Sequence, residues 1–240
     1  MYTFYMAVQT DERLFTPAEV ADRLGVSVNR VQAMVRAGQL QSVPVNSRIR
    51  LIPLRSMLHA RAYIGHSGRP YAERTSIAVL YTLSGSHINW LTKQQNYRMR
   101  RQLAGTDVDT LIRNLRNRGI VREYQASDKV VAAVRNSIQE SASSPDIRQQ
   151  LQLMATDMAE GYITPEGLRS IERQYRLNND LKPTKIRFHV SQYINQQNGT
   201  SLTAFAAIDL AESTDIRERI AGRNALAELL SAYQKETNYE

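Results

Sequence analysis

The chain has 240 residues, 42% of them hydrophobic, which is enough to build one large or two ordinary folded domains. Its formal charge of +8 favours an anionic partner. The absence of cysteine excludes disulfides, thiol catalysis and cysteine-based zinc sites. No stretch holds the ~18 apolar residues that a membrane span requires, so we expect a folded, cytoplasmic protein without membrane contact.

Positive charge is concentrated in the first part of the chain. Residues 1–70 hold nine Arg and no Lys against four acidic residues, and residues 71–141 hold eleven basic residues against six acidic. Residues 142–240 hold eleven basic residues against thirteen acidic. We therefore expect the surface that meets an anionic partner before residue 142, and a different partner for the last part.

The stretch 14–63 begins with a helix whose two ends are marked. Thr16 is followed by a proline and, three positions on, by Glu19, which is a capping box with proline at the first helical position. Gly25 suits the left-handed conformation that commonly follows a helix. We therefore predict a helix over residues 17–24.

A second helix, capped by Ser27 and ended by Gly38, follows at once. Its residues Val31, Met34 and Val35 have the spacing of a core face. Asn, Arg and Gln on the opposite face are the residue types that pair with base edges in a DNA major groove. The side chains expected at the DNA on this helix are Ser27, Val28, Asn29, Arg30, Gln32 and Arg36.

From residue 41 the apolar pattern alternates. This pattern predicts a two-stranded wing, formed by SVPV, a polar turn at Asn46-Ser47 and RIRLI. Ile49 and Leu51 are expected on one face of its second strand and the arginines Arg48 and Arg50 on the other. Positive charge on a wing supplies affinity for phosphates. A third helix near residues 54–62 is expected to pack on the first two. The base-reading set is Asn29, Arg30 and Gln32, and the phosphate-binding set is Arg36, Arg48 and Arg50, with Ser47 beside it.

The order of these features resembles the excisionase and MerR type of winged helix-turn-helix domain. TPAEVADRLGVS, RVQ, VRAGQL and the R-x-R-x-I-P ending occur together in that order. The resemblance implies binding of double-stranded DNA by the second helix. Val28, Asn29 and Asn46-Ser47 depart from the family pattern, so no base preference is implied. The alternative is a small interaction domain whose arginines are merely solvated.

The glycines and proline of residues 65–70 mark a linker, so we place a domain boundary after residue 66. Three helices follow over 73–84, 93–104 and 108–119, the second capped by Thr92 and the third by Thr106. They form a predicted helical basic domain, residues 67–141. Its arginines are either an additional basic surface or an ordinary solvated face: Arg98, Arg100, Arg101, Arg113, Arg116, Arg118 and, just beyond, Arg122.

The polar run ESASSPD, residues 140–146, is interpreted as a second linker or a loop before a third domain, residues 142–240. Strands are predicted near 158–163 and 185–190, and helices after Pro145, after Thr164 and over LTAFAAIDLAES. The closing helix, 215–233, should turn inward Ile216, Ile220, Leu226, Leu229 and Leu230. The predicted fold is mainly α within an α+β class: an N-terminal winged helix-turn-helix domain and a mixed, largely helical C-terminal region.

A second resemblance covers most of residues 67–232. SGRP, LSG, RMRRQL, the D-x-L-I-R-N-L helix and AIDLAES.D.RER resemble actinobacterial-type proteins encoded beside toxins. They are similar to antitoxins of type IV abortive-infection systems, whose toxin is a nucleotidyltransferase, or of pairs with a PIN-domain ribonuclease. The resemblance implies that the first domain represses its own operon and the rest neutralises the toxin.

No catalytic or metal-binding motif is evident. His59, His66, His87 and His189 lack the spacing of metal ligands. The Asp107-x-Asp109 pair lies in the first turn of a helix, where capping explains it better than metal binding. We therefore expect no enzyme activity, no cofactor and no metal.

The leading hypothesis is a DNA-binding repressor, the antitoxin of a toxin-antitoxin pair. A single helix-turn-helix module covers a modest surface, so a homodimer on a repeated or palindromic operator is expected. The alternative is an excisionase-like accessory factor that bends DNA beside a recombinase, although bending needs only the small domain. An enzyme that acts on nucleotides is a third hypothesis, which requires metal or nucleotide binding.

Overall fold

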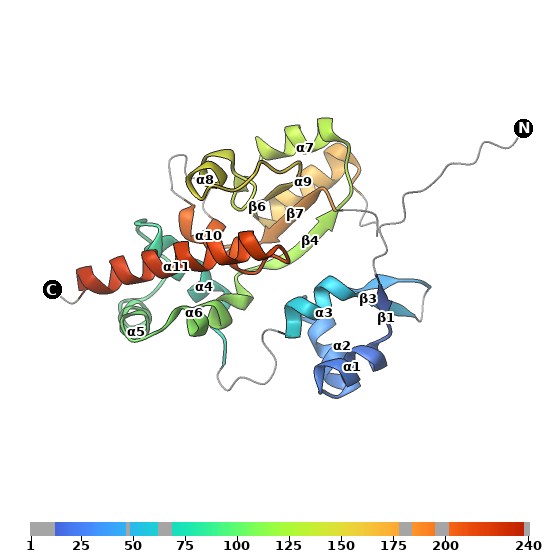
Figure 1. Cartoon of the computed structure of the whole chain (residues 1–240), viewed down its shortest axis with the longest axis horizontal. Helices are drawn as coiled ribbons and strands as arrows, with labels where there is room; N and C mark the ends of the chain where they lie inside the picture. Colours follow the sequence, from blue (N-terminus) through green and yellow to red (C-terminus); the bar gives the residue numbers. More distant parts are fainter. Residues whose placement is uncertain (1–12, 47–48, 62–68, 178–183, 195–201, 238–240) are drawn as a thin grey trace, which may run out of the picture. The chain divides into compact units, whose positions relative to one another are not determined.

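The computed structural model describes residues 13–46, 49–61, 69–177, 184–194 and 202–237 (Figure 1). The chain divides into two compact units, Met1–Ile64 and Gly65–Glu240. Helices and short strands alternate in both, which confirms the predicted α+β class. None of the helices in the described residues combines the length and apolar character that crossing a bilayer requires.

The first unit packs three helices against a small sheet. Its elements are β1 (Leu14–Phe15), α1 (Pro17–Leu24), α2 (Val28–Arg36), β2 (Val43–Pro44), β3 (Arg50–Pro53) and α3 (Leu54–Arg61). β3 lies between β1 and β2 and pairs antiparallel with both. The three helices and the two wing strands confirm the prediction. β1 was missed because two residues are too few to show a strand pattern.

The core of this unit includes only the end of the second wing strand. Ile52, opposite Phe15 on β1, is fully buried, whereas Ile49 is 49% exposed and Leu51 is half-buried. β3 enters the core only at its end, beside β1, so the residues near the wing tip extend past the helices. The face predicted for Ile49 and Leu51 therefore contributes little to the core, which the wing enters at Ile52.

The second unit is built from one four-stranded sheet and eight α-helices within its described residues. Its elements are α4 (Glu73–Leu83), α5 (Lys93–Ala104), α6 (Val108–Asn114), η1 (Leu115–Asn117), β4 (Ile120–Tyr124), α7 (Asp128–Arg135), β5 (Gln139–Glu140), α8 (Pro145–Gln150), β6 (Ala159–Ile163), α9 (Pro165–Tyr175), β7 (Ile186–Val190), α10 (Thr203–Ala211) and α11 (Ile216–Thr237). The strand order is β4-β7-β6-β5. β6 and β7 are parallel, and the other two pairs are antiparallel.

The two faces of this sheet differ in chemistry. Tyr124, Ile163 and Phe188 alternate onto one face, where they pack with α7 and α9 in an apolar core. Figure 1 shows α7 and α9 above these strands. The opposite face carries polar and aromatic side chains: Glu123, Glu160, Tyr162, Arg187 and His189. α10 lies against that face, as the hydrogen bond from the Tyr162 hydroxyl to Asp209 of α10 shows.

The predicted division between residues 141 and 142 is wrong. β4 and β5 precede it, β6 and β7 follow it, and all four belong to one sheet. The run ESASSPD is no linker, since Ser141 and Ser143 are buried in it. The Ser143 hydroxyl donates to the Glu160 carbonyl (3.0 Å) and accepts from the Glu160 amide (2.8 Å). The expected boundary after residue 66 lies outside the described residues.

Two further expectations are corrected in the helices. Asp107, rather than Thr106, caps α6, and its carboxylate accepts from the Thr110 amide at 2.8 Å. On α11 the inward face carries Leu226 and Leu230 as predicted, with Leu229 half-buried. Ile216 and Ile220 are 63% and 53% exposed, so the first turns of α11 do not face the core.

α10 and α11 form a tightly packed helical hairpin at the centre of the second unit. α10 is buried from Ala204 to Ala211. α11 can approach it because residue 222 is glycine. A Cβ at that position would lie 2.6 Å from the Ala207 carbonyl oxygen and 2.7 Å from the Leu210 carbonyl carbon, with the Ala211 amide nitrogen in the way as well. Only glycine permits this distance between the helices.

We predict that Gly222→Ala destabilises the protein by about 1–3 kcal/mol, because the new methyl group must push apart two helix backbones. The free energy of unfolding, measured with urea, tests this. Gly105→Ala is the matched control, since a Cβ there has nothing within 4 Å and the backbone φ is −112°. Equal stability of the two variants would contradict the prediction.

Candidate DNA interface and a buried polar cluster

Local hydrogen bonds fix the angle between α1 and α2. The Thr16 amide donates to a Glu19 carboxylate oxygen (2.7 Å), and the Glu19 amide donates to the Thr16 hydroxyl (3.3 Å), which confirms the capping box. Gly25 has the predicted left-handed conformation, with φ of +64°. Ser27 then caps α2 by accepting from the Arg30 amide at 3.2 Å. The turn between the helices is therefore set within twelve residues of sequence.

α2 presents one face to the core and the other to solvent. Val31 and Met34 are buried, and Val35 packs partly against the same core. The side chains predicted to meet DNA are all exposed: Ser27, Val28, Asn29, Arg30, Gln32 and Arg36. Arg30 and Arg36 make no ion pair with any described residue, so their guanidinium groups are available to an anionic partner.

The wing places a further arginine in solvent. The Val45 amide donates to the Ile49 carbonyl (2.9 Å) and the Ile49 amide to the Asn46 side chain (2.8 Å), which closes the turn. Arg50 is exposed, and its Nε donates to the Ser42 hydroxyl at 2.9 Å. Ser47 and Arg48, the other predicted wing contacts, lie outside the described residues.

The predicted additional basic surface divides into three environments. Arg98, Arg100 and Arg101 are exposed on α5. Arg113 is half-buried and donates to the Thr110 hydroxyl (2.7 Å); Arg116 is half-buried as well. Arg118 is 4% exposed and belongs to the interior, so its assignment to a surface is wrong. Residue 118 lies seven positions after the buried Leu111 and three after the buried Leu115, so helical spacing places it on the inward side, and only its charge suggested a surface position.

Arg118 is one end of a polar cluster between the sheet and α10. Its Nε donates to the Tyr162 hydroxyl (2.8 Å), and its Nη2 donates to Asp209 Oδ1 (2.9 Å) and to a Glu212 oxygen (2.5 Å). Tyr162 donates in turn to Asp209 Oδ1 at 2.9 Å. Burial raises the pKa of Tyr162 well above its usual value despite the opposing charge of Arg118, so the hydroxyl remains a donor.

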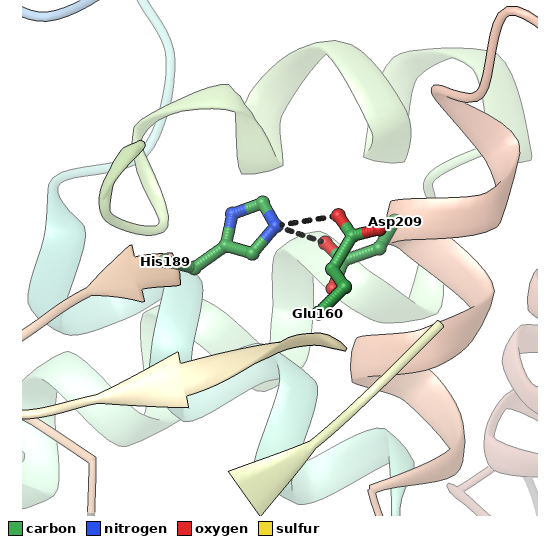
Figure 2. Close-up of side chains that lie close together, drawn as sticks. All are labelled: Glu160, His189 and Asp209. Atoms are coloured by element: carbon green, nitrogen blue, oxygen red, sulfur yellow. Dashed lines mark hydrogen bonds and ion pairs between the residues drawn. The ribbon is translucent and has the colours of Figure 1, made fainter. Parts of the chain in front are cut away.

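The other end of the cluster is formed by His189, Glu160 and Arg187. Figure 2 shows His189 Nε2 between two carboxylates, 3.1 Å from Glu160 Oε1 and 3.5 Å from Asp209 Oδ1. The His189 ring also stacks on Tyr162, with centroids 4.8 Å apart. Burial alone would raise the pKa of Glu160, but the charge of Arg187, aided by the His189 hydrogen bond, lowers it to about 2.

Glu160, His189 and Asp209 form the one group in the described part of the chain with the donor atoms for a metal ion. Each offers one ligand atom, and these atoms lie within 4.8 Å of one another. Arg118 and Arg187 already donate to the two carboxylates, so the group is held as an ion-pair network, in which the second oxygen of Asp209, Oδ2, is buried without a hydrogen-bond partner. The sequence analysis missed it because the three residues lie 20 or more positions apart.

We predict that Arg118→Met costs about 3 kcal/mol or more, because it leaves the fully buried Asp209 carboxylate without its cation. Urea unfolding measures this. The added substitution Asp209→Leu should recover part of the loss, since both charges are then gone. Arg169→Met is the control: it breaks an exposed pair with Glu166 and should cost less than about 1 kcal/mol. An Arg118→Met variant as stable as this control would contradict the prediction.

Comparison with known proteins supports the assignment of the first unit. Residues 6–54 match the family model for the winged helix-turn-helix domain of DNA-binding protein Rv2175c. The match does not extend into the second unit. The comparisons with curated proteins and with solved structures returned no match. The family match and the geometry of α1, α2 and the wing agree that the N-terminal unit is a winged helix-turn-helix domain that binds double-stranded DNA.

Proposed function

We propose that the protein is a sequence-specific transcriptional repressor that acts as the antitoxin of a toxin-antitoxin pair. The observation that carries the DNA-reading part is the exposed face of α2. Asn29, Arg30 and Gln32 there have the hydrogen-bonding groups that distinguish base pairs in the major groove. Arg36 and Arg50 add positive charge for the phosphate backbone.

The size of the DNA-binding unit supports binding as a homodimer. Its recognition helix, α2, spans Val28–Arg36 and can reach only a few base pairs. Two copies on repeated or palindromic half-sites would supply the additional contacts that an operator-specific complex needs. This arrangement suits a protein that represses its own operon.

The second unit supports a role in binding a protein rather than in catalysis. Its buried charged groups are engaged in ion pairs, Arg118 with Asp209 and Glu160 with Arg187. The unit is larger than the DNA-binding unit, and bending DNA would not require it. Its resemblance to antitoxins points to a toxin, a nucleotidyltransferase or a PIN-type nuclease, as the partner that it neutralises in the cytoplasm.

Two substitutions separate base reading from phosphate binding. Arg30→Ala should lower the preference for the operator over a random duplex by about tenfold. Arg50→Ala should weaken both duplexes alike and make the salt slope shallower by about one. Fluorescence anisotropy with the region upstream of the chain's own gene tests this, with Arg173→Ala on α9 as an exposed control.

Equal affinity of the unmutated protein for operator and random DNA would contradict the repressor proposal. A circular-permutation gel shift, which measures DNA bending, distinguishes the repressor from the excisionase-like alternative. A large DNA bend would favour the excisionase-like accessory factor.

The antitoxin proposal predicts a complex with the product of the adjoining gene. Co-expression with a tag on that product should recover the full chain at fixed stoichiometry, and should restore growth that the product alone inhibits. Arg30→Ala should leave this complex intact, because α2 belongs to the DNA-binding unit. Growth inhibition that the chain does not relieve would contradict the antitoxin role without affecting the repressor proposal.

A further inference from the structure

α5 carries an unusual charge composition. Its twelve residues include Lys93, Arg98, Arg100 and Arg101 and no acidic residue. All four side chains are exposed. They make no ion pair with any described residue. Helices on an ordinary solvated surface mix charges of both signs, so α5 stands out as a uniformly positive surface.

This helix accounts for the net charge of the second unit. Residues 65–240 hold 23 Lys and Arg against 19 Asp and Glu, and α5 contributes four of the bases and none of the acids. The remaining 19 bases and 19 acids balance. Several arginines elsewhere in the unit have acidic partners: Arg118, Arg148, Arg169, Arg187 and Arg223. The charge of α5 is therefore uncompensated, unlike that of its surroundings.

An exposed aromatic residue lies among these bases. Tyr97 is 65% exposed, and helical spacing places it beside Lys93 at i−4, Arg100 at i+3 and Arg101 at i+4. A tyrosine hydroxyl is one of the groups that commonly hydrogen-bond to DNA phosphates. With Arg98, these side chains form the α5 stripe, which combines four cations with one neutral donor, and all of these groups can bind phosphate oxygens.

The stripe is held on a fixed support. Met99 and Leu103 bury the opposite face of α5, and Thr92 closes its first turn with a capping box. At the other end, Gln234 of α11 donates to the carbonyls of Leu103 (2.9 Å) and Thr106 (3.0 Å). Because the backbone of α5 is already fixed, binding of a charged polymer needs to order only the side chains.

We propose that α5 is a second DNA-binding surface, which contacts the phosphate backbone of double-stranded DNA without reading its sequence. Duplex DNA carries negative charge at short, regular intervals and so matches a uniformly positive stripe. An acidic protein partner is the alternative, but its carboxylates would lie at irregular positions, whereas phosphates recur at a fixed spacing along a duplex. The same chain contains a DNA-binding domain, which favours DNA as the polyanion. The proposal adds to base reading by α2 and does not depend on it.

The test uses the full chain with Arg98→Gln, Arg100→Gln and Arg101→Gln together. Affinity for a random-sequence duplex should fall about tenfold near 0.1 M salt, and the salt slope should become shallower by about 2–3, as three lost phosphate contacts require. Tyr97→Phe should weaken binding severalfold without changing the slope. Anisotropy over a series of salt concentrations measures both quantities.

The matched control is Arg173→Gln, Arg176→Gln and Arg217→Gln, which removes the same charge from exposed positions on α9, at its C-terminal cap and on α11. This control should keep a slope close to that of the unmutated protein. A slope change equal to that of the α5 variant would overturn the proposal, because net charge alone would then explain it. An unchanged slope together with lost binding to poly-glutamate would overturn it in favour of an acidic protein. These outcomes are read on random DNA, so they are independent of operator preference.

Discussion

The second unit depends on the buried contact between Arg118 and Asp209. A carboxylate with a fully buried side chain is strongly unfavourable unless a cation and hydrogen-bond donors replace its water. Arg118 and Tyr162 supply these to one oxygen of Asp209, and His189 lies close to it. They come from the segment before β4, from β6 and from β7, so α10 can bury Asp209 only when the sheet has its native order. One ion pair thereby couples the packing of the α10–α11 hairpin to the correct pairing of the strands.

The two units are specified over very different sequence distances. In the first, Thr16, Gly25 and Ser27 fix the helix-turn-helix through contacts a few residues apart. In the second, β6 and β7 are parallel neighbours joined through α9, and the Arg118–Asp209 contact spans 91 positions. Contacts between residues close in sequence suit a small domain that must present one helix in a defined direction. Contacts between residues far apart in sequence suit a larger unit, in which several helices and strands must be held in fixed positions.

This difference explains what could be predicted from the sequence. Helix caps, helix ends and alternating strand patterns are local signals. From them the sequence predicted the helices, the main strands and the outward face of α2. Burial of a charged residue is not local, because Asp209, the carboxylate that makes the burial of Arg118 possible, lies 91 positions away. The cluster of Glu160, His189 and Asp209 likewise requires the sheet register. Polar composition misled in residues 140–146, where buried serines satisfy backbone groups of β6.

The distribution of paired and unpaired charge then separates structure from recognition. Arginines such as Arg118 and Arg187 are neutralised inside the unit, so they stabilise and orient the fold but contribute little field outside it. Arg30 and Arg36 on α2, and the bases of α5, meet no described acid and leave positive potential in solvent. Because phosphate binding requires available cations, pairing is a better guide to an anionic partner than the total charge of +8. By that criterion the cations of α2 and α5 are available to an anionic partner, whereas Arg118 and Arg187 are not.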